Sequence, residues 1–306
     1  MWSYTLRRLL ATIPTLLAVI TVTYFLLHAA PGGPFDSERI VSAAVLANLQ
    51  AKYHLDLPPW QQYLYYLNNL LHGDLGASFR YADWSVNDLV AAALPVSLSI
   101  GGISLLLSFV IGIGLGIAAA LRQNSAADYA VMLVGNLGSV FPSFVIGPVL
   151  VLVFAVSLHW LPAGGWDAFA PRFMILPIAL LTFINVATIA RVMRGSLIEV
   201  MHSNFIRTAR AKGLPTRIVV LRHALKPALL PVISVLGPLA IGSITAALVT
   251  ETVFSLPGIG KLIVNGAGNR DYTLVLGLVV LITVLAVTLN LLVDLAYAAL
   301  DPKIRY

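Results

Sequence analysis

The residue types that catalyse reactions or bind metals are sparse in this 306-residue chain. The six histidines never take the HExxH spacing that puts two imidazoles on one face of a helix, and no GxSxG turn presents a serine nucleophile. Cysteine is absent, which excludes disulfides, thiolate zinc sites and thiol nucleophiles. The sequence therefore predicts no metal, no cofactor and no catalytic centre on this chain.

One segment, the Gly-Ile-Gly-Lys sequence at 258–261, looks like the end of a phosphate-binding loop. Such a loop needs an earlier glycine, at position 255 here, and a hydroxyl residue directly after the lysine. The chain has Ser255 and Leu262 at those positions. We therefore predict that this segment binds no nucleotide.

Two acidic residues, Glu251 and Asp294, lie near the ends of long apolar runs. Proton- or ion-coupled carriers usually place such groups at mid-membrane. The sequence leaves two roles open for Glu251, lining a transport pathway or accepting hydrogen bonds within a helix bundle, whereas Asp294 is expected to be structural. The candidates for a pathway or outer gate are Glu251, Pro257, Gly258 and Gly260.

The most informative polar segment is the basic stretch 191–226. Within it, Ser203 or Asn204 can cap the start of a helix. Gly213 can end that helix in the left-handed conformation, and Pro215 prevents its continuation. The candidate functional residues of this stretch are Asn204, Phe205, Arg207, Thr208, Ala209, Arg210, Lys212, Gly213, Leu214 and Pro215.

The helix framed in this way, at about 205–212, needs outside support, because isolated helices shorter than about 12–15 residues are marginal in water. Its basic residues could be held by anionic lipid, or the helix could dock into a partner protein. The defined start and end of this helix and its apolar face favour docking into a protein. Ala209 would then lie against the partner's groove. A second helix is expected from about Thr216 until Pro227 turns the chain into the next apolar run. The apolar side chains available for docking are Phe205, Ile206, Ala209 and Leu214.

Composition sets the fold class, since 59% of the residues are hydrophobic and 10% are charged. Soluble domains carry roughly 25% charged residues. A transmembrane helix needs about 20 mostly apolar residues, and we expect six such spans in an all-α integral membrane protein. Glycines at GxxxG spacing, Gly112 and Gly116, are expected to let helices pack closely. The expected spans are 9–30, 94–121, 130–157, 173–191, 229–252 and 274–299.

The first apolar run, 9–30, is longer than the roughly 7–15-residue core of a secretory signal, and no A-x-A site closes it. We therefore expect an uncleaved first span. With the N-terminus in the cytosol, 13 of the 19 lysines and arginines fall on the inner side and 6 on the outer side. This positive-inside bias predicts that both termini are cytosolic and accounts for the net charge of +6 without nucleic acid.

The loop at 31–93 is then external, and its middle part, 37–71, is expected to form short amphipathic helices. Four aromatic residues there are candidates for lipid-interface anchors or for a docking surface, and anchoring is favoured because aromatic side chains concentrate at membrane interfaces. These residues are Trp60, Tyr63, Tyr65 and Tyr66.

The segment 204–215 resembles the cytosolic EAA loop of ABC importer permeases. Arg207, Thr208 and Ala209 occupy the E-A-A positions, and Gly213 follows four residues after Ala209. Arginine and threonine replace the first two letters of the motif.

A second departure is that Lys226 stands where the loop's proline is expected, with Pro227 one residue later. Both departures resemble the peptide-transporting branch, and the 306-residue layout is most like the first permease subunit of an oligopeptide importer. Further agreement comes from Arg7-Arg8 with Pro14, Ala30-Pro31-Gly32, the segment 73–78, the segment 251–260, Asn269-Arg270-Asp271-Tyr272 and Asp301-Pro302.

The resemblance implies the type I fold of ABC importer permeases in a bacterial inner (plasma) membrane. It also implies a second homologous permease subunit, cytosolic ATPase subunits that bind ATP and Mg, and an external binding protein that delivers peptide. ATP hydrolysis would then belong to the partners. The chain would have an N-terminal helix and loop at 1–93, a five-helix core at 94–301 with a coupling loop at 192–228, and a tail at 302–306.

The main alternative is a secondary transporter driven by an ion gradient. Such a carrier would need charges at mid-span and usually has more helices. A membrane-embedded hydrolase is a further alternative, but the sequence offers no nucleophile–base pair for it.

Overall fold

The structure, a computed structural model, describes residues 2–29, 56–81 and 83–300. Its regular elements are helices, apart from one isolated bridge between Ala77 and Ser85, which confirms the expected all-α class. The tail at 302–306 and the first part of 37–71 lie outside the described residues. In chain order the helices are α1 (Trp2–Ala29), α3 (Pro59–Leu71), α4 (Val86–Leu121), α5 (Ala126–Val140), α6 (Ser143–Leu150), the π-helix η1 (Val151–Ser157), α7 (Pro171–Met201), α8 (Asn204–Ala211), α9 (Thr216–Ile218), the π-helix η2 (Val219–Ala224), α10 (Leu225–Val253), α11 (Ile259–Gly268) and α12 (Tyr272–Leu300).

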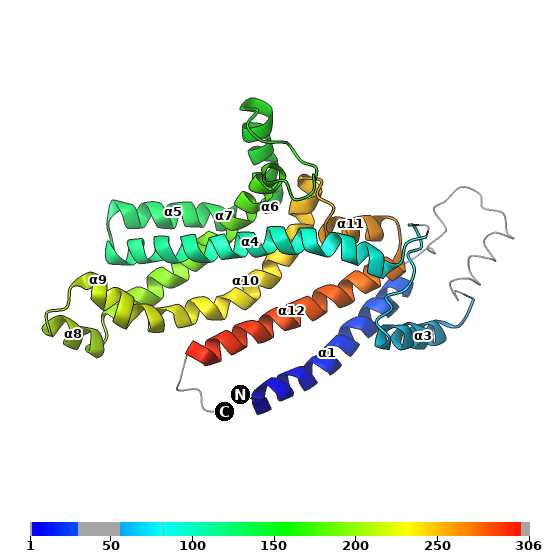
Figure 1. Ribbon diagram of the computed structural model, residues 1–306, viewed down its shortest axis with the longest axis horizontal. Helices are drawn as coiled ribbons and strands as arrows, with labels where there is room; N and C mark the ends of the chain where they lie inside the picture. The colour runs from blue at the N-terminus through cyan, green and yellow to red at the C-terminus, as the bar shows by residue number, and fades with distance from the viewer. Residues whose placement is uncertain (1, 30–55, 82, 301–306) are drawn as a thin grey trace.

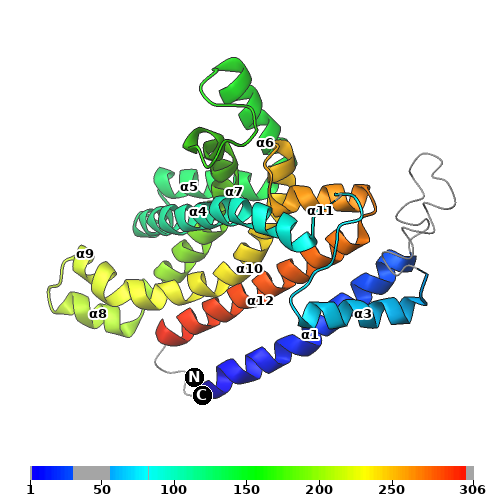
Figure 2. The same ribbon diagram turned by 45° about the vertical axis from the view of Figure 1, so that its right-hand side comes forward.

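The long helices lie lengthwise beside one another (Figures 1 and 2). The short helices α8 and α9 lie at one end of this bundle, which we call the α8 end. The helices α3 and α11 lie at the opposite end, which we call the α11 end. The two groups of candidate residues found in the sequence therefore occupy opposite ends of the molecule.

Five helices are long and apolar enough to cross a membrane, and a bent pair gives a sixth span if it is counted as one. Each of the six apolar runs thus corresponds to helix in the described part of the chain. The five are Leu10–Ala29, Val86–Leu121, Pro171–Met201, Thr216–Val253 and Tyr272–Tyr297, and the pair is Ala126–Gly138 with Ser143–Ser157.

The third expected span, 130–157, is bent, because the helical segments Ala126–Gly138 and Ser143–Ser157 meet at an angle of 102°. Phe141, between them, has an extended backbone with φ −83° and ψ 124°. Pro142 follows it, and proline disfavours the α conformation in the residue that precedes it. The proline therefore ends α5 and redirects the chain.

The turn expected at Pro227 is also wrong. The chain runs as one continuous helical segment from Thr216 to Val253, through α9, η2 and α10. The π-helical segment η2 lies directly before α10, and its wider turns relieve the clash that a proline ring makes with the preceding turn of an α-helix. The basic loop is thereby joined rigidly to α10.

Helices α4 and α7 pack at very close range along a row of small residues. A Cβ built on Gly112 would lie 2.7 Å from the Ile189 side chain, and one built on Gly116 would lie 2.7 Å from the Ala190 carbonyl oxygen. The GxxxG pair is therefore part of ordinary helix packing, as expected. The buried small residues of this row on α4 are Ser104, Ser108, Gly112, Gly116 and Ala119.

At the α11 end, α3 packs on α1 and α12 through one face. Tyr66 is buried there with Ile20 and Leu276, and the Tyr63 hydroxyl is hydrogen-bonded to the Thr21 hydroxyl at 2.6 Å. The expected surface role of Tyr66 is therefore wrong. Trp60 and Tyr65 of the same helix are exposed, at 57% and 49%.

Candidate functional site

The helix α8 begins and ends close to the expected residues. Ser203 is the residue before its first turn, but its hydroxyl donates to the Val200 carbonyl at 2.6 Å and makes no capping bond. Asn204 is already helical, so neither side chain expected to cap the helix does so. At the other end Gly213 has φ +78° and its N–H donates to the Arg210 carbonyl at 2.9 Å, which confirms the left-handed residue.

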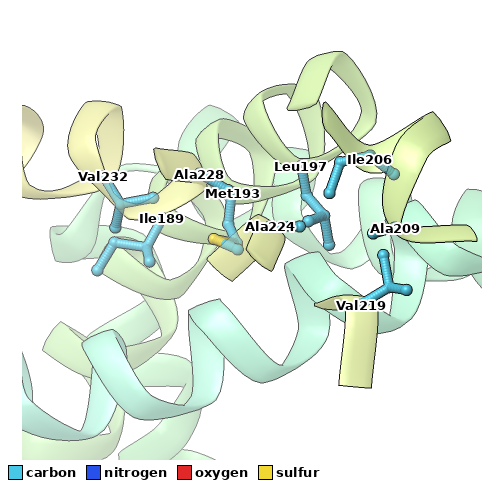
Figure 3. Packing of buried hydrophobic residues seen from close by; sticks show 9 residues of the cluster. All are labelled: Ile189, Met193, Leu197, Ile206, Ala209, Val219, Ala224, Ala228 and Val232. Atoms are coloured by element: carbon cyan, nitrogen blue, oxygen red, sulfur yellow. The ribbon is translucent and has the colours of Figure 1, made fainter. Parts of the chain in front are cut away.

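One face of α8 packs against the rest of the chain. Ile206 is fully buried and Ala209 is 5% exposed, and both belong to a cluster with Leu197 of α7, Val219 of η2 and Ala228 of α10 (Figure 3). This internal packing supplies the support that so short a helix requires. The expectation that Ala209 faces a partner's groove is wrong, because the space around it is filled by this chain.

The opposite face of α8 is open and basic. Phe205 is 50% exposed, a large apolar ring on an otherwise polar surface. The neighbouring candidate residues Arg207, Thr208, Arg210 and Lys212 are exposed as well. This face offers one aromatic anchor surrounded by positive charge, a combination enriched in protein interfaces.

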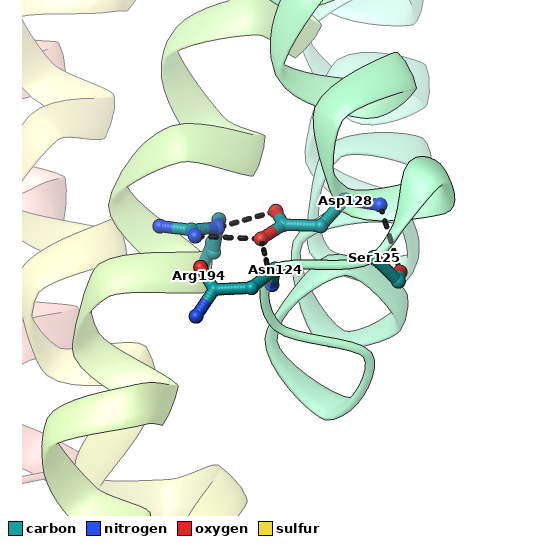
Figure 4. Close-up of polar contacts among 4 residues, drawn as sticks. All are labelled: Asn124, Ser125, Asp128 and Arg194. Atoms are coloured by element: carbon teal, nitrogen blue, oxygen red, sulfur yellow. Dashed lines mark hydrogen bonds and ion pairs between the residues drawn. The ribbon is translucent and has the colours of Figure 1, made fainter.

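An ion pair between Arg194 of α7 and Asp128 of α5 holds these two helices together (Figure 4). Arg194 donates from Nε and one terminal nitrogen to the two oxygens of Asp128, at 2.5 and 2.7 Å. The Asn124 N–H donates to the same carboxylate at 2.9 Å, and Ser125 caps α5. Because Asp128 is buried and bidentately paired, loss of either partner would leave an uncompensated charge.

At the α11 end, Glu251 lies at the end of α10 and is fully buried. It accepts hydrogen bonds from the Ser97 hydroxyl at 2.5 Å and from the N–H groups of Gly260 at 2.7 Å and Lys261 at 3.3 Å. The carboxylate thus compensates the unpaired N–H groups in the first turn of α11. Glu251 is therefore a hydrogen-bond acceptor between helices, and it also lines the cavity described below.

The glycines of this segment are required by close contact. A Cβ on Gly258 would lie 2.3 Å from the Glu251 carboxylate, and a Cβ on Gly260 would lie 2.6 Å from the Leu248 Cα atom. Pro257 is exposed at the turn before them. The N–H groups of Gly260 and Lys261, in the segment that looks like the end of a phosphate loop, already donate to Glu251.

A cavity of about 170 Å³ lies beside this site between α4, α10, α11 and α12. Its walls are mostly apolar or small, as at Gly101, Gly102 and Ala247, and Glu251 is the one charged residue among the described residues that line it. Ser97, which also lines it, was missed by the sequence reasoning. A serine within an apolar run gives no signal, and its partner lies 154 positions away.

Comparison with known proteins identifies the family. Residues 112–306 match the family model described as "Binding-protein-dependent transport system inner membrane component". This chain belongs to that family. It is 55% identical over its full length to the oligopeptide transport system permease protein OppB of Escherichia coli K12, with both chains covered completely. It is 40% identical over 302 residues to the dipeptide transport system permease protein DppB of Bacillus subtilis, covering 99% of this chain and 97% of that one.

Solved structures agree in fold. A chain of the inward-facing MetNI methionine ABC transporter superposes with a TM-score of 0.61 at 18% identity, covering 70% of this chain and 96% of that chain. The expected fold, that of an ABC importer permease, is confirmed. Membership of this family makes the chain a multi-pass inner membrane permease and favours an ABC importer over a secondary transporter.

Proposed function

We propose that this chain forms, with a second homologous permease subunit, the membrane pathway of an ATP-driven oligopeptide importer. The observation that carries the proposal is the 55% identity with OppB over 306 residues, an alignment that covers both chains completely. An external binding protein delivers the peptide, and cytosolic ATPase subunits bind ATP and Mg and hydrolyse ATP. The chain itself carries no cofactor in this proposal.

The α8 end faces the cytosol and both termini lie on that side. The distribution of lysine and arginine supports this orientation, because the basic stretch that contains α8 carries eight of the 19 positive residues. The loop with α3 and the α11 end then face outward, where the binding protein would dock.

The open face of α8 docks into a groove of an ATPase subunit. Phe205 is the apolar anchor of this contact, and Arg207, Arg210 and Lys212 steer it by charge. Ile206 and Ala209 hold α8 to α7, η2 and α10, so that movement of the docked helix is passed to the spans rather than absorbed in a loose loop. The remaining loop residues, Asn204, Thr208, Gly213, Leu214 and Pro215, frame the helix.

The Glu251 site is part of the outer gate. It ties α10 to α4 through Ser97 and to α11 through Gly260, beside the cavity between these helices. When the ATPases close, relative movement of α10 and α4 would strain this junction and open the pathway outward. Pro257 and Gly258 form the turn on which α11 would pivot.

The domain organisation fits this division of roles. The helix and loop of 1–93 lie outside the region matched by the family model, whereas the core at 94–301, with the coupling loop at 192–228, contains most of that region. The segment 302–306 is a cytosolic tail in this proposal.

Reconstitution tests the function directly. The chain is expressed with its partner subunits, purified in mild detergent and placed in vesicles with the external binding protein. We expect an ATPase to co-purify and peptide uptake to require ATP. Uptake of peptide by this chain alone, driven by a proton gradient, would contradict the proposal and restore the secondary-transporter alternative.

A further inference from the structure

A second cavity, of about 230 Å³, lies at the α11 end between α1, α3 and α12. It is separate from the cavity beside Glu251 and shares no lining residue with it. Residues from four segments line it, including Tyr24, His28, Tyr66, Asp74 and Tyr272.

Aromatic rings form a continuous wall of this cavity. The Tyr24 and His28 rings are stacked with centroids 4.1 Å apart, the His28 and Tyr272 rings are 5.7 Å apart, and the Tyr24 and Tyr66 rings are 6.4 Å apart. The faces of tyrosine rings attract cations through their quadrupoles. Such a wall suits a positively charged group better than an anion.

The charge of the lining points the same way. Asp74 supplies a carboxylate, and among the described lining residues there is neither lysine nor arginine to neutralise it. One Asp74 oxygen accepts the Gly76 N–H at 2.8 Å. The other makes no hydrogen bond within the described part of the chain, so it can accept one from an ammonium group.

Tyr66 contributes only its ring to this wall. Its hydroxyl is buried out of reach of solvent and has no hydrogen-bond partner among the described residues, so a ligand in the cavity does not contact that hydroxyl.

We propose that this cavity binds the primary ammonium group of a ligand, with the Asp74 carboxylate accepting its hydrogen bond and the tyrosine wall packed against the cation. Two sources carry this chemistry: the ethanolamine headgroup of a phospholipid and the amino terminus of a free peptide. The site itself does not rest on the transport function proposed above.

Binding is measured on the complete transporter, purified with its partner subunits but without the external binding protein. Native mass spectrometry counts bound phosphatidylethanolamine, with phosphatidylglycerol, which has no amine, as the control. Calorimetric titration measures the affinity for trialanine, with N-acetyl-trialanine, which lacks the ammonium but keeps the carboxylate, as the control. The variant is Asp74→Asn. Asp83→Asn is the matched control, since Asp83 is an exposed acid of the same loop outside the cavity, and its φ of +64° is one that asparagine accepts.

We expect one of the two amines to bind, its control to bind at least about fivefold more weakly, and Asp74→Asn to weaken binding by about fivefold. Asp83→Asn should bind like the unsubstituted protein. Equal binding of the amine and its control, no binding of either amine, or unchanged binding in Asp74→Asn would overturn the proposal. Because no transport is measured, these outcomes are independent of those that test the proposed function.

Discussion

The Ser78 hydroxyl donates a hydrogen bond of 2.5 Å to Asp271, a residue 193 positions later in the chain. Both side chains are buried. The second Asp271 oxygen accepts the N–H groups of Phe79 and Leu274, each at 3.2 Å. One carboxylate therefore caps the start of α12 and holds the loop that follows α3, so the external segment and the last span are fixed to each other.

Replacing Asp271 by alanine should lower the free energy of unfolding by about 2–3 kcal/mol, because a helix cap and the acceptor of buried donors are lost together. Ser78→Ala should cost about 1 kcal/mol. Thermal unfolding of the purified transporter in detergent measures both. The double variant should cost less than the sum of the two, since the residues share one interaction. Strict additivity would show that the hydrogen bond contributes nothing.

Gly213→Val should destabilise the end of α8 by about 1–2 kcal/mol, since a β-branched residue resists the left-handed conformation. A Cβ there would meet no atom within 4 Å, so the cost comes from the backbone alone. Gly213→Asn is the control, because asparagine tolerates positive φ. We expect the valine variant to lose ATPase association and peptide uptake, and the asparagine variant to keep most of both. Equal loss in both variants would point to side-chain contact instead of conformation.

Phe205→Ala and Ala209→Leu should fail in different ways. Phe205 is exposed, so its removal should leave the thermal stability unchanged but weaken co-purification of the ATPase. Ala209 is buried against this chain, so a leucine there should cost about 1–3 kcal/mol through overpacking. Stability in detergent and ATPase recovery are measured for each. A stable Ala209→Leu variant with normal packing would contradict the inward orientation of that residue.

Gly260→Ala should displace α11 from α10, because its Cβ would lie 2.6 Å from the Leu248 backbone. The expected cost is about 1–3 kcal/mol. A Cβ at Gly268, on the same helix, would meet no atom within 4 Å, so Gly268→Ala should not change the stability.

If the junction acts as an outer gate, a cysteine in place of exposed Pro257 should react faster with an external thiol reagent in the Gly260→Ala background. An unchanged labelling rate would argue against the gate.

Membrane sidedness can be read from single cysteines, since the chain has none of its own. An impermeant thiol reagent applied to intact cells should label Asp83→Cys and leave Arg210→Cys unlabelled. Permeabilised cells should show labelling at both positions. Labelling of position 210 in intact cells would reverse the proposed orientation.

The sequence by itself determined the helical membrane class, the six apolar runs and the framing of α8. These features depend on neighbours in the chain: a long uncharged run, or a glycine followed two residues later by proline. Each acts through the local backbone or through transfer into lipid, so no distant residue needs to be known.

Tertiary structure alone decided which face of α8 is free and which groups form hydrogen bonds with Glu251. Ala209 and Phe205 are both apolar, and only the packing of α7, η2 and α10 shows that the first is buried and the second exposed. Likewise, Ser97 and Glu251 meet only because α4 and α10 lie together, and no pattern in either run predicts that pair. Which side chains come into contact depends on how helices pack against one another, and that is a property of the whole chain rather than of any one segment.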